Sequence, residues 1–401
     1  MADLTSVQSL LKEVWHDRLE VAFSEEIVGL QRIQSSSDGV RSDISGRYTV
    51  VPMRVGRNEG LGSRLEREVL PLPGQQQYVA ARVELTKQVG VGDISAEALK
   101  LADREPRSFI NTIDRELEGL KDDLMYDYAR QFYGDGTGTM ATVVAVAGND
   151  VEVDNWQYLG EDARLDSVTP GTGVVTASFR TITAIDEGAD TITLDDAAGV
   201  LVGDVLVRSG SYDKEINGLG IGLQQGATLQ NIDPAVVRRW DPVVIDTGVG
   251  RAYNELEVIQ ALDSTRRRAG KQATVMFTGF GVRRAIFSTL VANREFHNTV
   301  EFGHGFSALP FTLGAKTVPI VEDPHFPEAF GADTGSIYGV CEEDVAIYRH
   351  EDGWHFADET GSIFLQATNR SDAWEFRVRQ FSQMGYHQRN SHFVIGNINT
   401  A

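Results

Sequence analysis

One amphipathic stretch constrains the fold of this chain more than any other, the segment from residue 108 to residue 138. Apolar side chains recur in it every three or four residues, which places them on one face of an α-helix. These residues are Phe109, Ile113, Leu117, Leu120, Leu124, Tyr128 and Phe132. At about 1.5 Å per residue, a helix over residues 108–133 would be roughly 39 Å long, so we predict a spine on which other elements pack.

The predicted spine helix is followed by Gly-Asp-Gly-Thr-Gly at residues 134–138. Glycine adopts the left-handed conformation without a side-chain penalty, so we expect Gly134 to end the helix in that conformation. We predict that Gly134, Asp135, Gly136 and Gly138 form a hinge between this helix and the α/β region that follows later in the chain.

Composition narrows the class of protein. The chain has 401 residues, enough for two or three compact units, and a net charge of −21, which argues against general nucleic-acid binding because like charges repel. Its single cysteine, Cys341, excludes an internal disulfide, and we expect it to be buried. No run approaches the ~18 apolar residues of a membrane span, and no export signal is evident, so we expect a soluble protein that is not exported.

The first part of the chain, residues 1–45, contains apolar residues at helical spacing up to about residue 33, followed by a Ser-Ser-Ser-Asp-Gly loop at residues 35–39. Two interpretations remain open. The segment is either an arm that packs on another chain or a helix that packs on its own chain.

Two strands are predicted next, at residues 47–56 and 77–89, and the second alternates apolar and polar side chains. About twenty residues connect them, including Gly60 and Gly62, which is too long for a tight hairpin. Because two strands alone are marginal in water, a long ribbon of this kind needs a second surface to lie on.

The ribbon segment is locally basic. Residues 41–87 carry eight basic and five acidic side chains, in a chain that is acidic overall. We therefore predict that Arg57, Arg64 and Arg67 dock on the second surface that the ribbon needs, and the alternative is a solvated surface loop.

Residues 141–215 differ in composition from the rest of the chain. They carry fourteen acidic and four basic residues, with short β-like runs divided by turn signals. We predict a small all-β module inserted between the spine helix and the following region.

From residue 217 the pattern becomes mixed α/β, with helices predicted near residues 254–269 and 281–293, a strand at 274–277, and a tail rich in strands. Asn254 and Glu257 form a predicted capping pair. The arginines at 266–268 could form a nucleic-acid patch, but their place in the last helical turn favours interaction with the helix dipole.

No catalytic, cofactor-binding or metal-binding constellation is evident. Residues 134–138 follow a helix and do not complete a dinucleotide fingerprint, residues 305–309 lack the last glycine of a nucleophile elbow, and the eight histidines show no metal-ligand spacing. We predict no catalytic residue, no metal and no cofactor, and a chain that is not an enzyme.

The order of arm, ribbon, spine helix and α/β region with a β-rich tail resembles the major capsid proteins of tailed bacteriophages, which have the Hong Kong 97 fold. Further resemblance lies in INGLGIGL at 216–223, NELEVIQAL at 254–262, LGAKTVPIVEDPHFP at 313–327, GSIYGV at 335–340 and the segment 377–398. The resemblance implies an α+β fold with six parts. These are an N-terminal arm (1–45), an extended loop (46–90), a peripheral domain with the spine helix (91–140), the inserted β module (141–215), an axial domain (216–361) and a C-terminal β-rich return (362–401).

The function that the resemblance implies is structural. The chain would be a coat subunit that assembles into pentamers and hexamers of an icosahedral shell enclosing double-stranded DNA, in the virion capsid, after assembly in the host cytoplasm. A separate scaffolding protein, a portal and possible decoration proteins are the expected partners, with no membrane. A bacterial nanocompartment shell of the encapsulin type is the alternative, and a soluble enzyme is the remaining one. Residues 57–77 contain no lysine, so we do not expect the isopeptide crosslink that some relatives form there.

Overall fold

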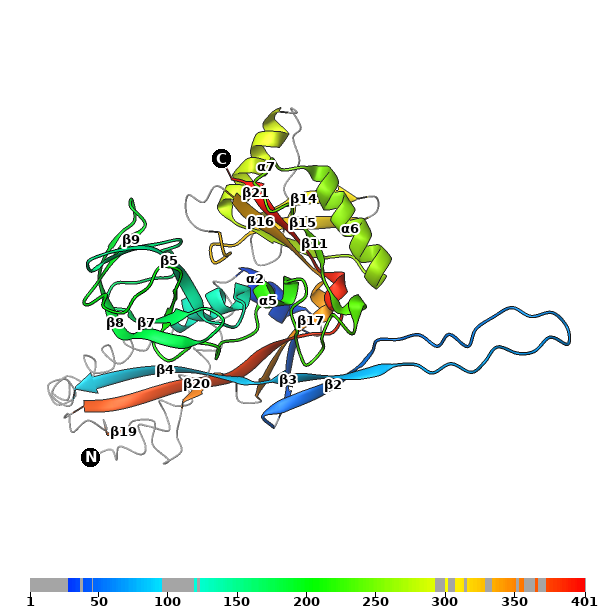
Figure 1. The fold of residues 1–401 in the computed structure, drawn as a ribbon, viewed down its shortest axis with the longest axis horizontal. Helices are drawn as coiled ribbons and strands as arrows, with labels where there is room; N and C mark the ends of the chain where they lie inside the picture. Colours follow the sequence, from blue (N-terminus) through cyan, green and yellow to red (C-terminus); the bar gives the residue numbers. More distant parts are fainter. Residues whose placement is uncertain are drawn as a thin grey trace.

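The structure is a computed structural model, and it describes most of the 401 residues. The described residues are 28–36, 39–44, 46–95, 119–120, 123–292, 300–301, 307–313, 316–328, 334–350, 353–356, 365–366 and 373–400. They form a mixed α+β structure with two large sheets, a closed β-barrel and a long two-stranded ribbon (Figure 1).

One long strand, β20 (Ala373–Tyr386), organises the first sheet. It pairs antiparallel with β4 (Thr86–Ser95) over ten residue pairs, from Thr86 opposite Ser382 to Ser95 opposite Ala373. Its other partners complete the sheet: β17 (Val345–His350), β18 (His355–Phe356) and β19 (Leu365–Gln366), with β1 (Val40–Ile44) parallel to β17.

The ribbon consists of β2 (Tyr48–Arg54), β3 (Tyr78–Glu84) and the connecting residues 55–77, called the ribbon loop below. The strands pair antiparallel from Tyr48 opposite Glu84 to Arg54 opposite Tyr78, as the alternating sequence predicted. Only Leu85 separates β3 from β4, so the ribbon is continuous with the first sheet. Figure 1 shows the ribbon loop extending far beyond the rest of the molecule.

The predicted spine helix is described at residues 119–120 and 123–133, all of which are helical. Its apolar face packs as expected, because Tyr128 and Phe132 are buried in the central core and Leu120 and Leu124 pack against it. The other predicted packing residues, Phe109, Ile113 and Leu117, lie outside the described residues.

The helix ends at Tyr133, but the expected left-handed conformation at Gly134 is wrong. The Gly134 N–H donates to the carbonyl of Gln131 (3.0 Å), which tightens the last turn, and the positive φ angles come later, at Gly136 (88°) and Gly138 (84°). The turn is therefore made after the helix has ended.

Residues 139–208 form a closed barrel with strand order β10-β5-β6-β9-β8-β7. The strands are β5 (Thr139–Ala147), β6 (Asp150–Val153), β7 (Arg164–Thr169), β8 (Val174–Asp186), β9 (Thr191–Leu194) and β10 (Val205–Arg208). Inward residues such as Val151, Ile182 and Ile192 are fully buried and form a core separate from the central one. Closure pairs the sheet edges, which stabilises so small a module.

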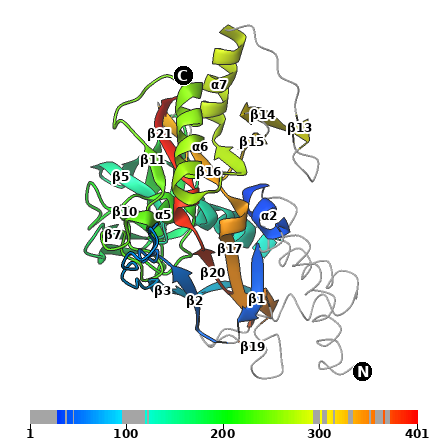
Figure 2. The same ribbon diagram turned by 90° about the vertical axis from the view of Figure 1, so that its right-hand side faces the viewer.

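The second large sheet has the order β11-β21-β16-β12-β15-β14-β13. Its strands are β11 (Val243–Ile245), β21 (Phe393–Asn399), β16 (Thr334–Val340), β12 (Val275–Thr278), β15 (Lys316–Glu322), β14 (Ser307–Leu313) and β13 (Val300–Glu301). Helices α6 (Glu255–Ala269) and α7 (Phe280–Ala292) share one core with this sheet (Figure 2). Phe277 belongs instead to the central core and contacts Tyr133 of the spine helix, with ring centroids 6.1 Å apart.

Helix α6 begins and ends close to where the sequence predicted, with one correction at its start. Asn254 caps the helix by accepting from the Leu256 N–H (3.0 Å), and Gly270 ends it at φ 74°. Glu257 does not complete a capping box, because its carboxylate pairs with Arg251 (2.9 Å). The arginines 266–268 occupy the last turn, as expected for residues that complement the helix dipole.

The described part of the chain contains no helix of the length and hydrophobicity needed to cross a bilayer. Over the same residues, no group of three or more His, Cys, Asp or Glu side chains is arranged to hold a metal ion. Cys341 is buried, as expected, and burial raises the pKa of its thiol to about 12.

Candidate assembly surface

The ribbon loop keeps its two arms close together through glycine. At Gly60, an added Cβ would lie 2.6 Å from the backbone nitrogen of Gly74 and 2.9 Å from the carbonyl oxygen of Leu72. A side chain at this position would therefore push the two arms apart, which explains the glycine that the sequence placed here. At Gly62 the nearest atom to an added Cβ belongs to the flexible Arg64 side chain (3.0 Å), so this second glycine is less constrained.

The tip of the ribbon loop is a turn at residues 65–68. The Glu68 N–H donates to the Leu65 carbonyl (3.2 Å), the Leu65 N–H donates to the Glu68 carboxylate (3.0 Å), and Arg67 has a φ of 69°. A non-glycine residue with positive φ is uncommon and costs some conformational energy. Arg67 is exposed at this tip.

The three predicted docking arginines differ in their surroundings. Arg64 donates to the carbonyls of Val69 (2.9 Å) and Ser63 (3.0 Å), so it braces the ribbon loop itself. Arg57 and Arg67 are exposed and make no ion pair within the described chain. Arg57 and Arg67 thus remain free to bind an acidic partner.

Exposed aliphatic side chains, which the basic composition of the segment does not reveal, are the most unusual feature of the ribbon loop. Five of them are between 77% and 88% exposed, namely Leu61, Leu65, Val69, Leu70 and Leu72. Single exposed leucines are ordinary, but a cluster on one projecting loop marks an interaction surface. The signal was present in the sequence as five aliphatics within twelve residues that otherwise read as a polar loop.

The root of the ribbon is fixed to the body. The Arg82 N–H donates to the carbonyl of Gln230 (3.0 Å), Thr86 Oγ1 donates to the carbonyl of Ser382 (2.8 Å), and Val83 is buried with Ile44. The body thus holds one end of the ribbon while the loop at the other end lies free.

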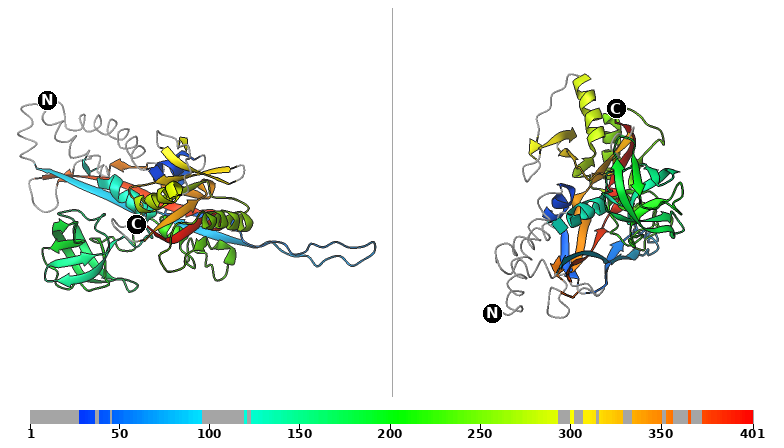
Figure 3. Two further views of the ribbon diagram at one scale, coloured as in Figure 1. Left: turned by 90° about the horizontal axis from the view of Figure 1, so that it is seen from above. Right: turned by 90° about the vertical axis from the view of Figure 1, so that its left-hand side faces the viewer.

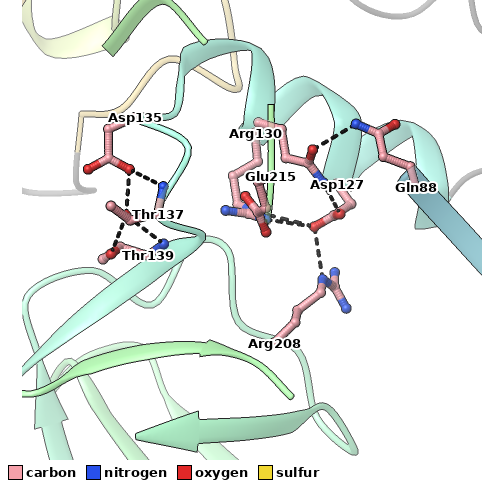
Figure 4. A network of polar contacts seen from close by, with 9 residues as sticks. Gln88, Asp127, Arg130, Asp135, Thr137, Thr139, Arg208 and Glu215 are labelled. Carbon is pink, nitrogen blue, oxygen red and sulfur yellow. Dashed lines mark hydrogen bonds and ion pairs between the residues drawn. The ribbon is translucent and has the colours of Figure 1, made fainter. Parts of the chain in front are cut away.

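The end of the spine helix carries a buried ion cluster that joins three parts of the chain (Figure 4). Arg130, only 5% exposed, pairs with Asp127 (3.0 Å) and with Glu215. Arg208 at the end of β10 also pairs with Asp127 (2.8 Å). The cluster ties the helix to the last barrel strand and to the segment that leaves the barrel.

The pKa values of the two carboxylates of this cluster shift in opposite directions. Burial by itself raises the pKa of Asp127, but the guanidinium groups of Arg130 and Arg208 outweigh it and hold that pKa below its ordinary value. Burial raises the pKa of Glu215, and Arg130 offsets this only in part. Asp127, which faces two guanidinium groups, is therefore the carboxylate that stays ionised most readily.

The predicted hinge residues lie where the chain enters the barrel, which separates them from the α/β region. Residues 134–138 enter β5, and residues 209–217 return from β10; together we call these two segments the stem. Within it, the Thr137 carbonyl accepts from the Asp213 N–H (2.9 Å), and Asp135 accepts from the Thr137 N–H (2.9 Å). The sequence could not show this pairing, since the two halves of the stem lie about seventy residues apart.

The glycines of the INGLGIGL string allow the returning chain to pack on the end of the spine helix. An added Cβ at Gly218 would lie 2.3 Å from the Gln131 carbonyl, and one at Gly220 would lie 2.9 Å from the Gly134 carbonyl. The Gly220 N–H donates to that same carbonyl (3.1 Å) and so satisfies a group that the helix end leaves open. Helix α5 (Leu219–Leu223) starts at this contact.

Asp204 supplies a pH-dependent part of the barrel's stability. Burial alone would raise its pKa, but hydrogen bonds from Thr176 (2.6 Å), Ser167 (2.9 Å) and Thr169 (3.0 Å) outweigh burial and lower it. A carboxyl whose pKa is lower in the folded state stabilises the fold above its ordinary pKa of about 4, and this stability is lost as the pH falls.

We expect Asp204→Asn to lower the free energy of unfolding by roughly 1–3 kcal/mol at pH 7, because the amide cannot accept from all these donors. The difference from the natural chain should shrink as the pH falls below about 4, where the carboxylate is protonated. Urea unfolding of the natural chain and the variant between pH 3 and pH 7 measures this difference in the free energy of unfolding. A difference that does not change with pH would contradict the stabilising role of the Asp204 carboxylate.

Comparison of the sequence with protein-family models and with curated proteins gives no match. Among solved structures, the chain is similar to the capsid of cyanophage A-1(L), with 13% identity, coverage of 93% of each chain and a TM-score of 0.57. It is also similar to the SrpI encapsulin of Synechococcus elongatus PCC 7942, with 10% identity, coverage of 92% of this chain and 88% of the encapsulin chain, and a TM-score of 0.46. A further similar structure is the capsid of Myoviridae phage XM1, with 10% identity, coverage of 93% of each chain and a TM-score of 0.43.

The similarity to the cyanophage capsid spans 93% of each chain, so it concerns the overall fold rather than one domain. The chain has the α+β fold of the Hong Kong 97 type of phage capsid protein, which confirms the fold expected from the order of its parts. At 13% identity this similarity establishes the fold alone.

Proposed function

We propose that this chain is the major capsid protein of a tailed bacteriophage, and that it assembles into pentamers and hexamers of an icosahedral shell around double-stranded DNA. The observation that carries the proposal is the ribbon loop, which extends beyond the body of its own subunit and presents five exposed aliphatic side chains and the exposed Arg67. A loop of this composition is stabilised when a neighbouring subunit covers it.

Each expected domain has its own role in the proposed shell. The extended loop (46–90) covers a neighbour, the peripheral part (91–140) with the spine helix supports it, and the axial part (216–361) surrounds the capsomer centre. The C-terminal segment (362–401) joins both sheets through β20 and β21. Within the N-terminal segment (1–45), helix α2 (Val28–Ser35) packs in the central core of its own chain and β1 pairs with β17, so we assign contacts with adjacent subunits to the residues that precede α2.

The barrel (141–215 in the expected division) lies on the outer face of the shell and adds contacts within capsomers. A scaffolding protein, a portal and decoration proteins are the remaining proposed partners in the host cytoplasm and the virion. The role is structural rather than enzymatic. A shell that must contain packaged DNA gains its strength by summing many modest interfaces through closed symmetry.

Purified particles test the function. Expression of the chain, alone and with its scaffolding partner, should give closed particles, and those isolated from infected cells should contain DNA. Closed particles that enclose an enzyme in place of DNA would assign the nanocompartment function, and a stable monomer under all conditions would contradict a shell.

Charge reversal tests the basic side of the ribbon loop. We expect the combined change of Arg57, Arg64 and Arg67 to Glu to weaken each ribbon contact by roughly 1–2 kcal/mol, since an exposed ion pair contributes about 0.2–1 kcal/mol. The yield of closed particles in gradient sedimentation should therefore fall severalfold. The matched change of the same three residues to Lys keeps the charge and should assemble nearly normally, and unchanged yield after reversal would refute the electrostatic contact.

A further inference from the structure

A groove rich in arginine lies where the root of the ribbon meets the axial part of the molecule. It encloses about 620 Å³, and its lining includes Arg41, Arg54, Arg57, Arg239 and Arg268. None of the residues that line it is acidic. The buried Arg389 is a sixth arginine of the lining. Six arginines without a carboxylate among them are unexpected in a chain with a net charge of −21.

These arginines come from separate elements. Arg54 ends β2, Arg57 follows in the ribbon loop, Arg239 lies in the short helix η1 (Arg238–Trp240), and Arg268 lies in the last turn of α6. Within the described chain none of them makes an ion pair, and Arg41 lies over the ring of Tyr348, 5.7 Å from its centroid. Like charges gathered from distant elements repel one another until an anion binds between them.

Two buried polar side chains of the groove also lack partners. Trp240 and Asn390 are each 5% exposed, and neither Trp240 Nε1 nor Asn390 Oδ1 has a hydrogen-bond partner in the described structure. Unsatisfied buried polar atoms are costly, but these two have almost no accessible surface, so the groove offers its arginines rather than these atoms to a partner.

The position of the groove indicates which molecule supplies the anion. Figures 1 and 3 show the ribbon and the barrel at opposite ends of the longest axis. In a closed ring of identical subunits the interface is heterologous, so the ribbon side of one subunit faces the opposite side of the next. In the ring that the proposed function requires, the barrel side of the next subunit would face the groove.

The barrel carries a suitable acidic turn between β8 and β9. Asp186, Glu187 and Asp190 are exposed and make no ion pair within the described chain, and Glu152 lies beside them because it pairs with Thr191 in the β6–β9 ladder. Its carboxylates match the guanidinium groups in charge and in hydrogen-bond geometry.

We propose that the arginine groove binds the acidic β8–β9 turn of the barrel of the neighbouring subunit within a capsomer. The proposal rests on the proposed shell function and assigns to the barrel a specific partner site. It differs from the ribbon-loop contact because Arg239 and Arg268 lie outside the ribbon.

Reciprocal charge reversal tests this pairing. Changing Arg239 and Arg268 to Glu, or changing Asp186, Glu187 and Asp190 to Lys, should each lower the yield of closed particles at least tenfold. Combining both sets in one chain places a reversed groove against a reversed turn, and it should recover most of the yield. The control Arg267→Glu, an exposed position of the same helix outside the groove, should leave the yield unchanged.

The outcomes separate the two proposals. If the natural chain forms particles and the groove reversal assembles equally well, or if the combined variant is no better than the poorer single set, the groove assignment is wrong and the shell function stands. If the groove reversal leaves assembly intact but lowers the nucleic acid retained by purified particles, the groove binds nucleic acid and the barrel contact is overturned. If the natural chain forms no particles, both proposals fail.

Discussion

Replacing Leu61, Leu65, Val69, Leu70 and Leu72 together by serine is expected to abolish the assembly of closed particles while the subunit itself remains folded. The side chains are at least 77% exposed in the free subunit, so their removal takes nothing from its core. In the assembled state each buried aliphatic side chain would contribute about 2 kcal/mol, and this contribution is lost in every copy. Sedimentation measures the loss of particles. The midpoint temperature of thermal unfolding of the unassembled subunit should stay within about 1 °C of that of the natural chain.

The matched control keeps the surface apolar. Changing the four leucines to methionine preserves volume and hydrophobicity, so this variant should still form closed particles. Normal particle yield from the serine variant would show that the exposed aliphatic cluster is not an interface.

The second large effect is expected at the buried ion cluster. Arg130→Met should lower the free energy of unfolding by roughly 3–5 kcal/mol, because it leaves Asp127 and Glu215 as buried carboxylates without their partner. Urea unfolding of the unassembled subunit measures the change. Limited proteolysis should also show faster cleavage in the stem, since the barrel loses its tie to the spine helix.

Two further variants make this prediction specific. Arg208→Met removes an ion pair whose arginine is 44% exposed, so the cost should stay below about 1 kcal/mol. Adding Glu215→Gln to Arg130→Met removes one of the two orphaned charges and should recover part of the lost stability. Equal destabilisation by Arg130→Met and Arg208→Met would contradict the central place of Arg130.

Local sequence patterns predicted most of the elements. The helical spacing of Leu120, Leu124, Tyr128 and Phe132 matched one packed face, and the alternation in residues 79–86 matched the pairing of β3 with β2. Asn254 and Gly270 marked the two ends of α6, because capping depends on neighbouring residues alone. These features are encoded within a few residues of where they act.

Features that depend on distant contacts were not predictable in the same way. Glu257 has the right spacing for a capping box, yet Arg251 competes for its carboxylate. The pairing of β4 with β20 joins residues nearly three hundred positions apart, and the cluster of Arg130 with Glu215 crosses the whole barrel insertion. Such contacts depend on tertiary packing. The spacing of residues along one segment does not show which distant segments pack together.

The predicted assembly site was found only in part. Basic composition pointed to Arg57, Arg64 and Arg67, but the structure shows Arg64 engaged within the loop and adds the aliphatic cluster beside it. Exposure of an aliphatic residue cannot be inferred from its identity, since the same residue type usually lies in a core. The hinge proposed for residues 134–138 remains a prediction, now for the stem of the barrel.

Cryo-electron microscopy of the assembled particles would show where the ribbon loop lies. We expect closed icosahedral shells of pentamers and hexamers in which the ribbon loop of each subunit lies over the next subunit. Leu61, Leu65, Val69, Leu70 and Leu72 should be buried at that contact. A ribbon loop that stays exposed in the shell, or folds back on its own subunit, would contradict it.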